Sequence, residues 1–534
     1  MISVADATYD TWRHLGMTTM FANPGSTEIP LLCRPDSGIR FVLGLHEGSV
    51  VGAATGFALA TGVPSLVVLH TTAGYGNAVG ALATARSNRA PLVVIVGQQD
   101  RRHLPLRPFL AGDLDGLAGS YPVWSSQPAL ATDVPGTIER AWHEARTRRG
   151  PAVVVVPMDD WDTEAEPRTT VTARQIVTAA GADPGALDDL AALVENSVSP
   201  VIVTGADADS EGAWSAIVAL AERLQAPVWQ EAFGARAGFP QDHDLFAGHL
   251  PSSRAYLRDA LADYDLVVVI GAQAFRQYLY EPGPFVSAAS RVAMIVDDPD
   301  LAHHSSADLA LVGPIPAICS HLTARVRARP GSAKRSIPDA SSTGDSHATK
   351  GALRSSDVFA SLALRLSPEC IVVEECPSSR PDLHRLLPAR RPLGFLSAAM
   401  GGLGFAMPAA VGLRMGRPDR PVVAVTGDGS ALYGIQALWT AVHYRVGVLF
   451  VVLSNGRYAI MDDLARMRGH PGPWPTFDEV SLSAVARGFG CTARRVEGHL
   501  ELEAVLDEAI RDRALADAPL LIDAIVHDEP DLAP

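Results

Sequence analysis

The sequence of 534 residues lacks the features that mark several classes of protein. Its five cysteines are odd in number, scattered and without a CxxC pair, which favours reduced thiols in a cytoplasmic protein over a disulfide framework. It has no run of Lys and Arg, and its formal net charge is −15, so nucleic acid is a poor candidate for a partner. The longest apolar run, 446–453, is far shorter than a membrane span, and residues 1–16 indicate an amphipathic helix rather than a signal peptide. We therefore expect a cytoplasmic protein that binds neither nucleic acid nor membrane.

A nucleotide-binding fingerprint is also missing from the middle of the chain. A Rossmann dinucleotide site needs a glycine-rich turn after its first strand. After the strand expected at 199–206 the chain reads TGADADSEGA, without GxGxxG. This argues against NAD or FAD there.

Short apolar runs instead alternate with helical patterns along the whole chain, which is typical of βαβ units and parallel sheets. Helices are expected at 48–60 and 76–86. Buried strands are expected at 39–45, 64–70, 91–97, 150–159, 199–206, 265–272, 291–297, 370–376, 420–430, 447–456 and 518–526. The predicted fold class is α/β, with three domains that each have a mainly parallel sheet flanked by helices.

The expected division has four parts. An N-terminal α/β domain covers 1–180, and a middle α/β domain covers 181–335. A stretch at 336–357, rich in Ser, Ala and Gly, has no hydrophobic period and is expected to be a linker. A C-terminal α/β domain follows at 358–534.

A candidate site for a phosphate and a metal lies in the last third. Gly427 and Gly429 flank Asp428 in an expected tight turn after a strand, a helix begins near Ser430, and the next strand ends at Asn455. Loops after parallel strands meet at one edge of a sheet. Glycines and a helix N-terminus suit a phosphate, and a carboxylate beside it suits an intervening Mg²⁺. The G-D-G stretch alone is explained equally well as a turn; the later Asn favours the metal.

A carboxylate among small and apolar residues poses a second question. Glu47 opens the stretch EGSVVGAATGFALATG, and a buried Glu without a partner is costly. It is either a helix N-terminal carboxylate favoured by the helix dipole, or a group to which something polar is brought.

These stretches resemble a known family. GDGS, followed at that spacing by SNG, is similar to the diphosphate and metal motif of the thiamine diphosphate-dependent enzymes, although Ser454 replaces the first of their two asparagines. The resemblance implies that Asp428, Asn455 and the main-chain carbonyl of Arg457 bind Mg²⁺. It also implies that Glu47 shares a proton with N1′ of the aminopyrimidine, which activates the cofactor.

Within the family, nearly the whole chain resembles the benzoylformate decarboxylases. ANPGSTEIP contains Ser26, LHTTAGYGNAVGAL contains His70, and SAAMGGLGFAMPAAVGL contains Gly401 and Leu403. The resemblance implies substrate contacts or proton transfer for Ser26 and His70, although a lone His is more often structural. The further cofactor contacts that it implies are Asn23, Pro24, Asn77, Ser378, Gly401, Leu403, Gly427, Gly429, Ser430, Tyr458 and Ile460.

The substrate-facing residues depart from that pattern. Tyr278 stands where the subfamily has a second active-site His, and a phenol is a poorer proton shuttle at neutral pH. Ser397 and Leu464 stand where aromatic side chains are expected. The remaining candidates for an apolar pocket are Phe109, Leu110, Ile460 and Met461.

The expected function is thiamine diphosphate- and Mg²⁺-dependent decarboxylation of an aromatic or branched 2-oxo acid to an aldehyde. The alternatives are a carboligase or lyase with the same chemistry, and a catalytically silent cofactor-binding homologue. The resemblance also implies a homo-oligomer whose subunits share active sites, at least a dimer and in the family's pattern a tetramer.

Overall fold

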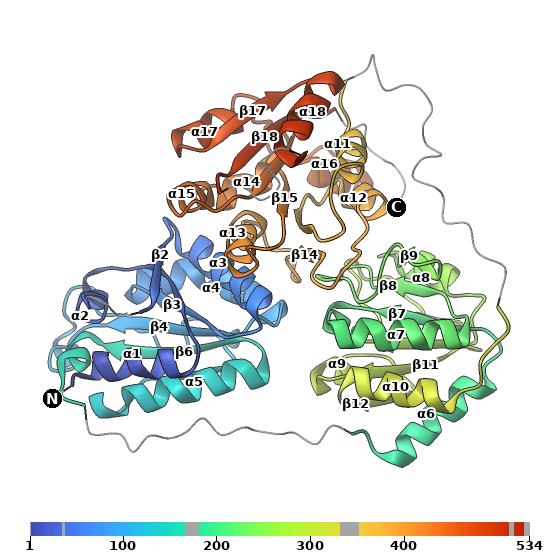
Figure 1. The fold of residues 1–534 in the computed structure, drawn as a ribbon, viewed down its shortest axis with the longest axis horizontal. Helices are drawn as coiled ribbons and strands as arrows, with labels where there is room; N and C mark the ends of the chain where they lie inside the picture. Colours follow the sequence, from blue (N-terminus) through green and yellow to red (C-terminus); the bar gives the residue numbers. More distant parts are fainter. Residues whose placement is uncertain (1, 35–37, 166–180, 332–351, 512–516, 528–534) are drawn as a thin grey trace. The chain divides into compact units, whose positions relative to one another are not determined.

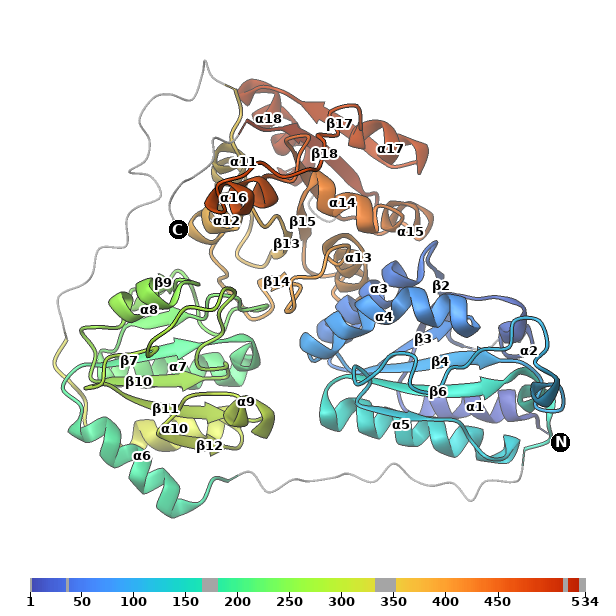
Figure 2. The same cartoon turned by 180° about the vertical axis from the view of Figure 1, so that it is seen from behind.

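The computed structural model describes residues 2–34, 38–165, 181–331, 352–511 and 517–527; Figures 1 and 2 show it from opposite sides. The described chain contains three six-stranded sheets, and all strand pairings described within them are parallel. The predicted fold class is therefore confirmed.

The chain forms two compact units. Unit 1 contains the described residues of 1–175, 373–378 and 398–527, and unit 2 contains those of 176–372 and 379–397. Most of the expected linker lies outside the described residues, and helix α11 (Ser355–Ala363) begins in its last three positions. The expected domain boundaries stay a prediction.

The first sheet has the strand order β2-β1-β3-β4-β6-β5. Its strands are β1 (Thr19–Asn23), β2 (Arg40–Leu43), β3 (Ser65–Leu69), β4 (Leu92–Gln98), β5 (Trp124–Ser126) and β6 (Pro151–Pro157). Its helices are α1 (Val4–His14), α2 (Ile29–Leu32), α3 (Glu47–Thr61), α4 (Thr71–Ser87) and α5 (Val134–Arg148). Helices α1 and α5 cover one face and α3 and α4 the other (Figure 1), so the Val-rich central strands are buried on both sides.

The second sheet has the order β12-β11-β10-β7-β8-β9. Its strands are β7 (Pro200–Thr204), β8 (Val228–Gln230), β9 (Phe246–His249), β10 (Leu266–Ile270), β11 (Arg291–Val296) and β12 (Leu309–Val312). Its helices are α6 (Pro184–Asn196), α7 (Glu211–Leu224), α8 (Arg254–Ala260), α9 (Pro299–His303) and α10 (Ile315–Arg325). The order reverses between β7 and β10, as in doubly wound folds.

The third sheet has the order β14-β13-β15-β16-β18-β17. Its strands are β13 (Ile371–Glu375), β14 (Phe395–Ser397), β15 (Val422–Gly427), β16 (Leu449–Ser454), β17 (Thr492–Val496) and β18 (Leu520–Ile525). The helices of this part, after α11, are α12 (Arg380–Leu386), α13 (Ala406–Gly416), α14 (Asp428–Gly434), α15 (Ala437–His443), α16 (Ala459–Met467), α17 (Leu482–Gly488) and α18 (His499–Leu506).

Within unit 1, helices α3 and α13 touch backbone to backbone. A Cβ atom added at Gly56 would lie 2.1 Å from the carbonyl oxygen of Ala409, and one added at Gly412 would lie 1.8 Å from the carbonyl oxygen of Ala53. Only glycine fits at such an approach. This contact joins the first sheet to the third, although the two helices are far apart in the sequence.

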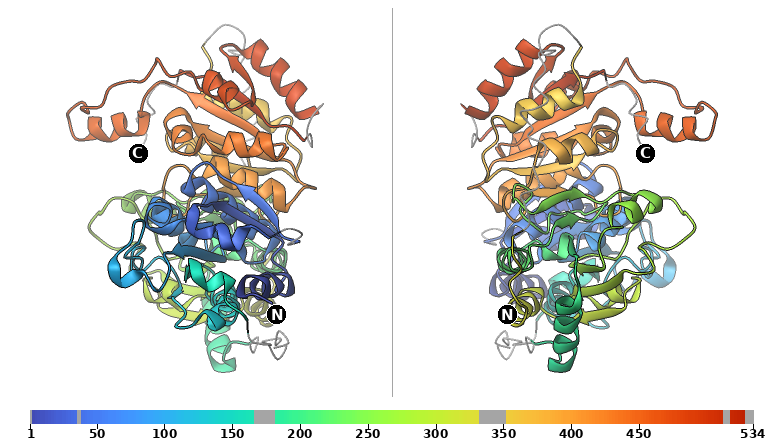
Figure 3. Two further views of the ribbon diagram at one scale, coloured as in Figure 1. Left: turned by 90° about the vertical axis from the view of Figure 1, so that its left-hand side faces the viewer. Right: turned by 90° about the vertical axis from the view of Figure 1, so that its right-hand side faces the viewer.

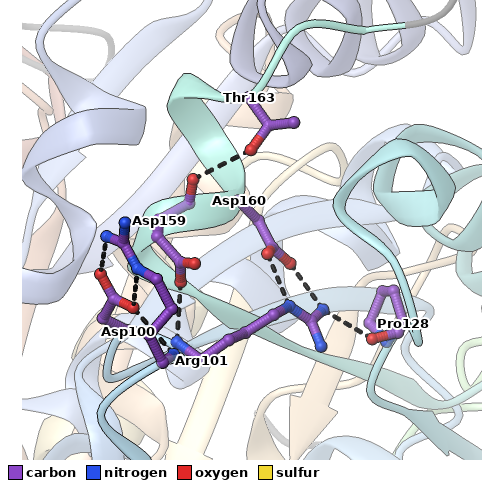
Figure 4. Close-up of polar contacts among 7 residues, drawn as sticks. Asp100, Arg101, Pro128, Asp159, Asp160 and Thr163 are labelled. Carbon is purple, nitrogen blue, oxygen red and sulfur yellow. Dashed lines mark hydrogen bonds and ion pairs between the residues drawn. The ribbon is translucent and has the colours of Figure 1, made fainter.

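An arginine clamp holds the loop that follows β4 (Figure 4). The Arg101 guanidinium donates to both carboxylate oxygens of Asp160, at 2.6 and 2.7 Å, and to the carbonyl oxygen of Pro128 at 2.6 Å. The Arg101 backbone N–H donates to Asp159. Asp160 is 1% exposed, so the pair is desolvated on its acidic side. The clamp fixes the start of the loop that carries Phe109.

Two general findings complete the fold. All five cysteines lie in the described residues, and none of them forms a disulfide. Among the helices that the structure describes, none is both long and apolar enough to cross a bilayer.

We predict that Gly412→Ala will lower the stability of unit 1 by about 1–3 kcal/mol, because the added methyl group overlaps the backbone of Ala53. The matched control is Gly488→Ala in α17, where an added Cβ would meet no heavy atom within 4 Å. Thermal unfolding of both variants measures the difference. An unchanged midpoint for Gly412→Ala would contradict the described approach of α3 and α13.

Candidate active site

The Glu47 carboxylate at the start of α3 is held by two asparagine side chains. Asn23, at the end of β1, donates its amide N–H to Oε1 at 3.0 Å, and Asn77 of α4 donates to Oε2 at 3.1 Å. Glu47 is 8% exposed, and no ion pair with Arg or Lys holds it among the described residues. Asn23 and Asn77, expected as cofactor contacts, thus lie on Glu47 and orient both of its oxygens.

His70 lies beside a second buried carboxylate, Glu28. His70 caps α4, and its Nδ1 lies 3.0 Å from Glu28 Oε2 and 3.0 Å from the hydroxyl oxygen of Thr27. Glu28 is 1% exposed, accepts the Gly25 N–H at 2.7 Å and accepts the Thr27 hydroxyl. A Cβ at Gly25 would overlap the His70 ring at 2.4 Å, so the glycine makes room for the imidazole.

Gly74 of α4 lies between these two groups. A Cβ atom added there would lie 3.5 Å from both Glu47 and His70. Ser26 begins the short 3-10 helix Ser26–Glu28 and is exposed, and Pro24 is half-buried before it. The carboxyl edge of the first sheet therefore carries two buried carboxylates, an imidazole and an exposed hydroxyl.

The strand β15 runs directly into α14 at Asp428. The helix that we expected to begin near Ser430 begins two residues earlier, so Asp428 and Gly429 lie in its first turn and not in a separate tight turn. The glycine at 429 instead makes room for Tyr458, whose ring carbon would lie 2.6 Å from an added Cβ. Ser430 is buried in the first turn.

Backbone amides surround the Asp428 carboxylate. Oδ1 accepts the Gly429 N–H at 2.7 Å, and Oδ2 accepts the N–H groups of Asn455 and Gly456 at 2.9 and 2.7 Å. Burial raises the pKa of Asp428, and these three donors oppose the rise. In the described residues no basic side chain forms an ion pair with it. A buried anion whose donors are all neutral fits a nearby cation.

Asn455, Asp428 and Arg457 are brought together as expected for an oxygen ligand set. The Asn455 side-chain oxygen accepts the Arg457 N–H at 3.1 Å, which sets its direction beside Asp428. No group of three or more His, Cys, Asp and Glu side chains within the described ranges has the geometry of a metal site. The residues present therefore fit a Mg²⁺ ion only together with oxygens from a ligand such as a diphosphate.

The remaining cofactor candidates lie on loops of unit 1. Gly401 has φ +71°, a conformation that favours glycine, and Leu403 is 41% exposed. Ser378 is exposed in the loop after β13.

The pocket candidates are divided between the units. In unit 1, Phe109 is 88% exposed, Leu110 has φ +69°, and α16 presents Ile460, Met461 and Leu464 on a helix without buried residues. Figure 3 shows the orange-red segment that contains α16 projecting from the third sheet. In unit 2, Tyr278 is 67% exposed, and Ser397 is buried with its N–H bonded to the carbonyl oxygen of Ala235 at 2.9 Å.

Three family models match the chain. They are the N-terminal TPP binding domain, the central domain and the C-terminal TPP binding domain of thiamine pyrophosphate enzymes, at residues 2–118, 187–322 and 378–524. Benzoylformate decarboxylase of Pseudomonas aeruginosa is 37% identical over 528 residues, which cover 98% of each chain. A putative acetolactate synthase large subunit of Mycobacterium tuberculosis is 29% identical over 544 residues, again 98% of each.

Solved structures agree with these matches. A thiamine diphosphate-dependent 4-hydroxybenzoylformate decarboxylase of Rhodococcus jostii superposes with a TM-score of 0.93 at 34% identity, over 99% of this chain and 100% of the other. Benzoylformate decarboxylase of Polynucleobacter necessarius gives 0.93 at 33% identity with the same coverage.

The chain belongs to the thiamine pyrophosphate enzyme family, in its branch of 2-oxo acid decarboxylases similar to benzoylformate decarboxylase. The predicted family is therefore confirmed, and its cofactor is thiamine diphosphate.

We predict that Glu28→Gln will lower kcat by roughly 10- to 100-fold with little change in secondary structure, because His70 loses the charged acceptor that orients its ring. Steady-state kinetics and circular dichroism measure the two effects. The control is Glu211→Gln, an exposed Glu in the first turn of α7, which should keep full activity. If Glu28→Gln and the wild type have the same kcat, Glu28 does not orient His70 for catalysis.

Proposed function

We propose that this enzyme decarboxylates a 2-oxo acid with an aromatic or branched side chain to the aldehyde and CO₂. The observation that carries the proposal is the Glu47 carboxylate, buried at a helix start and held by two neutral amides, with His70 close by. The similarity to decarboxylases of benzoylformate and 4-hydroxybenzoylformate over nearly the whole chain supports the substrate class.

The roles of the chain's own residues follow from their surroundings. Bound thiamine diphosphate supplies the carbanion and electron-sink chemistry. Glu47 exchanges a proton with the aminopyrimidine N1′, and Asn23 and Asn77 fix the direction in which its oxygens point. His70, with Glu28 on its Nδ1, holds or gives up a proton at Nε2 beside the substrate, and the Ser26 hydroxyl binds the substrate carboxylate.

At the other end of the cofactor, we propose that Asp428, Asn455 and the carbonyl oxygen of Arg457 hold Mg²⁺. Asp428 is buried and forms no ion pair with a basic side chain in the part of the chain that the structure describes, which supports this ligand set. The neighbouring groups proposed to bind the diphosphate are Gly427, Gly429, Ser430 and Ser378.

The enzyme is further proposed to be a homo-oligomer, a dimer or a tetramer, in the cytoplasm. Large apolar side chains of unit 1 at Leu403, Ile460, Met461 and Phe109 are exposed, which suits coverage by a second subunit. The absence of disulfides among the five cysteines of the described residues suits a reducing compartment.

A carboligase is the second candidate function, because an acetolactate synthase relative also covers 98% of the chain. The test is turnover of a panel of 2-oxo acids, aromatic, branched and short, with thiamine diphosphate and Mg²⁺, with CO₂ and aldehyde measured together. Equal amounts of CO₂ and aldehyde support the decarboxylase, and CO₂ with a ligated hydroxyketone supports the carboligase. Cofactor binding without CO₂ release from any substrate would indicate a catalytically silent homologue.

We predict that Glu47→Gln will reduce turnover by about 100-fold or more, because the amide cannot exchange the proton that the carboxylate exchanges. Stopped or continuous CO₂ assays at saturating cofactor measure this loss. Undiminished activity of Glu47→Gln would refute the proposed proton exchange.

We predict that Asp428→Ala will lose cofactor binding, measured by calorimetry in the presence of Mg²⁺.

We predict that Tyr278→His will speed the turnover of benzoylformate, because an imidazole exchanges protons near neutral pH and a phenol does not. The matched control is Tyr280→His, since Tyr280 lies two positions away and is 85% exposed. Initial rates on benzoylformate compare the two variants. An equal rate for Tyr278→His and the wild type would contradict the assignment of Tyr278 to the active site.

A further inference from the structure

A further buried carboxylate, Glu375 at the end of β13, has no place in the proposed chemistry. It is 4% exposed and accepts three consecutive backbone N–H groups. Gly404 donates to Oε1 at 2.5 Å, and Phe405 and Ala406 donate to Oε2 at 2.8 and 2.6 Å. All four residues belong to unit 1.

These three amides mark the point where a loop becomes a helix. Ala406 is the first residue of α13, so the carboxylate lies at the positive end of that helix. Just before it, the loop 401–405 carries Gly401 and Leu403, two of the proposed cofactor contacts. Gly404 has φ +85°, and an added Cβ there would lie 2.9–3.1 Å from Tyr433. The loop end is therefore packed closely, and Glu375 fixes its amides.

Glu375 also connects this loop to other parts of the proposed site. The chain continues from Glu375 into the loop with Ser378, and α13 packs by its glycines against α3, which begins at Glu47. Through the chain and through helix packing, Glu375 is therefore connected to the segments proposed to contact the two ends of the cofactor.

Opposing effects act on the pKa of the Glu375 carboxyl group. Burial raises the pKa of Glu375 to about 7, the three N–H donors oppose the rise, and the neighbouring carboxylate of Glu374 adds to it. The donors from α13 and its N-cap are the backbone N–H groups of Ala406 and Phe405. The ionised carboxylate accepts all three hydrogen bonds. A proton would go to Oε1, which has one donor rather than two, and would leave the Gly404 N–H facing a hydroxyl, a poorer acceptor.

We propose that Glu375 is a positioning residue that holds the loop 401–405 for thiamine diphosphate, and that its ionisation controls the affinity for the cofactor. This inference rests on the proposed function of the site. Protonation releases the Gly404 amide, loosens the loop beside Leu403 and weakens binding. The cofactor therefore binds more tightly above the pKa of Glu375 than below it.

The test measures the Kd of thiamine diphosphate with Mg²⁺ and no substrate, by calorimetry or tryptophan fluorescence, between pH 6 and pH 8. For one proton with a pKa of about 7, we expect Kd to rise up to about tenfold from pH 8 to pH 6. In Glu375→Gln this part of the pH dependence of Kd should vanish. Titration of the cofactor itself affects both proteins equally, so the ratio of the variant's Kd to the wild-type Kd at each pH isolates the contribution of Glu375. With the cofactor saturating, kcat should change less than about threefold.

Glu374→Gln is the matched variant, because it leaves the Glu375 carboxylate intact. Removing the adjacent negative charge should lower the pKa of Glu375 and move the midpoint of the Kd profile to lower pH. A purely structural role for Glu375 would not produce this shift, and the variant also serves if Glu375→Gln does not fold.

The inference is overturned if Glu375→Gln keeps the wild-type Kd profile, or if Glu374→Gln leaves the midpoint in place. Failure of the proposed function would look different, since the wild type itself would then not bind the cofactor or release CO₂.

Discussion

Parallel strands place all of their carboxyl ends at one edge of a sheet, and the candidate site depends on this constraint. Asn23 ends β1 and His70 follows β3 in the first sheet, while Glu375 ends β13 and Asp428 follows β15 in the third. Each polar group therefore stands where a buried hydrophobic strand gives way to a helix. The rigid strands fix where these groups lie, so their alignment depends little on the loops.

Four buried acids of unit 1 are held without arginine or lysine partners among the described residues. Glu47 is held by two amides, and Asp428 and Glu375 accept three backbone N–H groups each. Glu28 is held by His70, the Thr27 hydroxyl and the Gly25 N–H. Neutral donors hold an anion in place without cancelling its charge. Such carboxylates can still attract a proton or a metal ion, which a carboxylate paired with arginine, such as Asp160, cannot do as readily.

Much of this arrangement was accessible from the sequence, because long runs such as PLVVIVG and the spacing of Asp428 and Asn455 are strong signals. The strands that escaped prediction lack such runs. β5, β9, β12, β14 and β17 are short strands at sheet edges, and β8 is a three-residue strand inside the second sheet. β1 is a central strand with few β-branched residues. These segments form strands because they pair with neighbouring strands, and their own sequences show little strand pattern.

Glu28 also escaped, because a Glu in the first turn after a Ser reads as an ordinary helix start. The helix start at Asp428 was missed for a related reason: glycines suggest a turn, whereas Gly429 is there to admit Tyr458. A sequence gives the residue type but not the side chain that approaches it.

The glycine contact between α3 and α13 has a consequence for biosynthesis. Gly56 leaves the ribosome long before its partner at Ala409, with more than 350 residues between them. At a synthesis rate of about 5–20 residues per second, the small-residue face of α3 stays uncovered for roughly 20–70 s. The nascent N-terminal part therefore passes through a period in which that bare helix can pair with the wrong surface, and protection by chaperones during translation matters most in that interval.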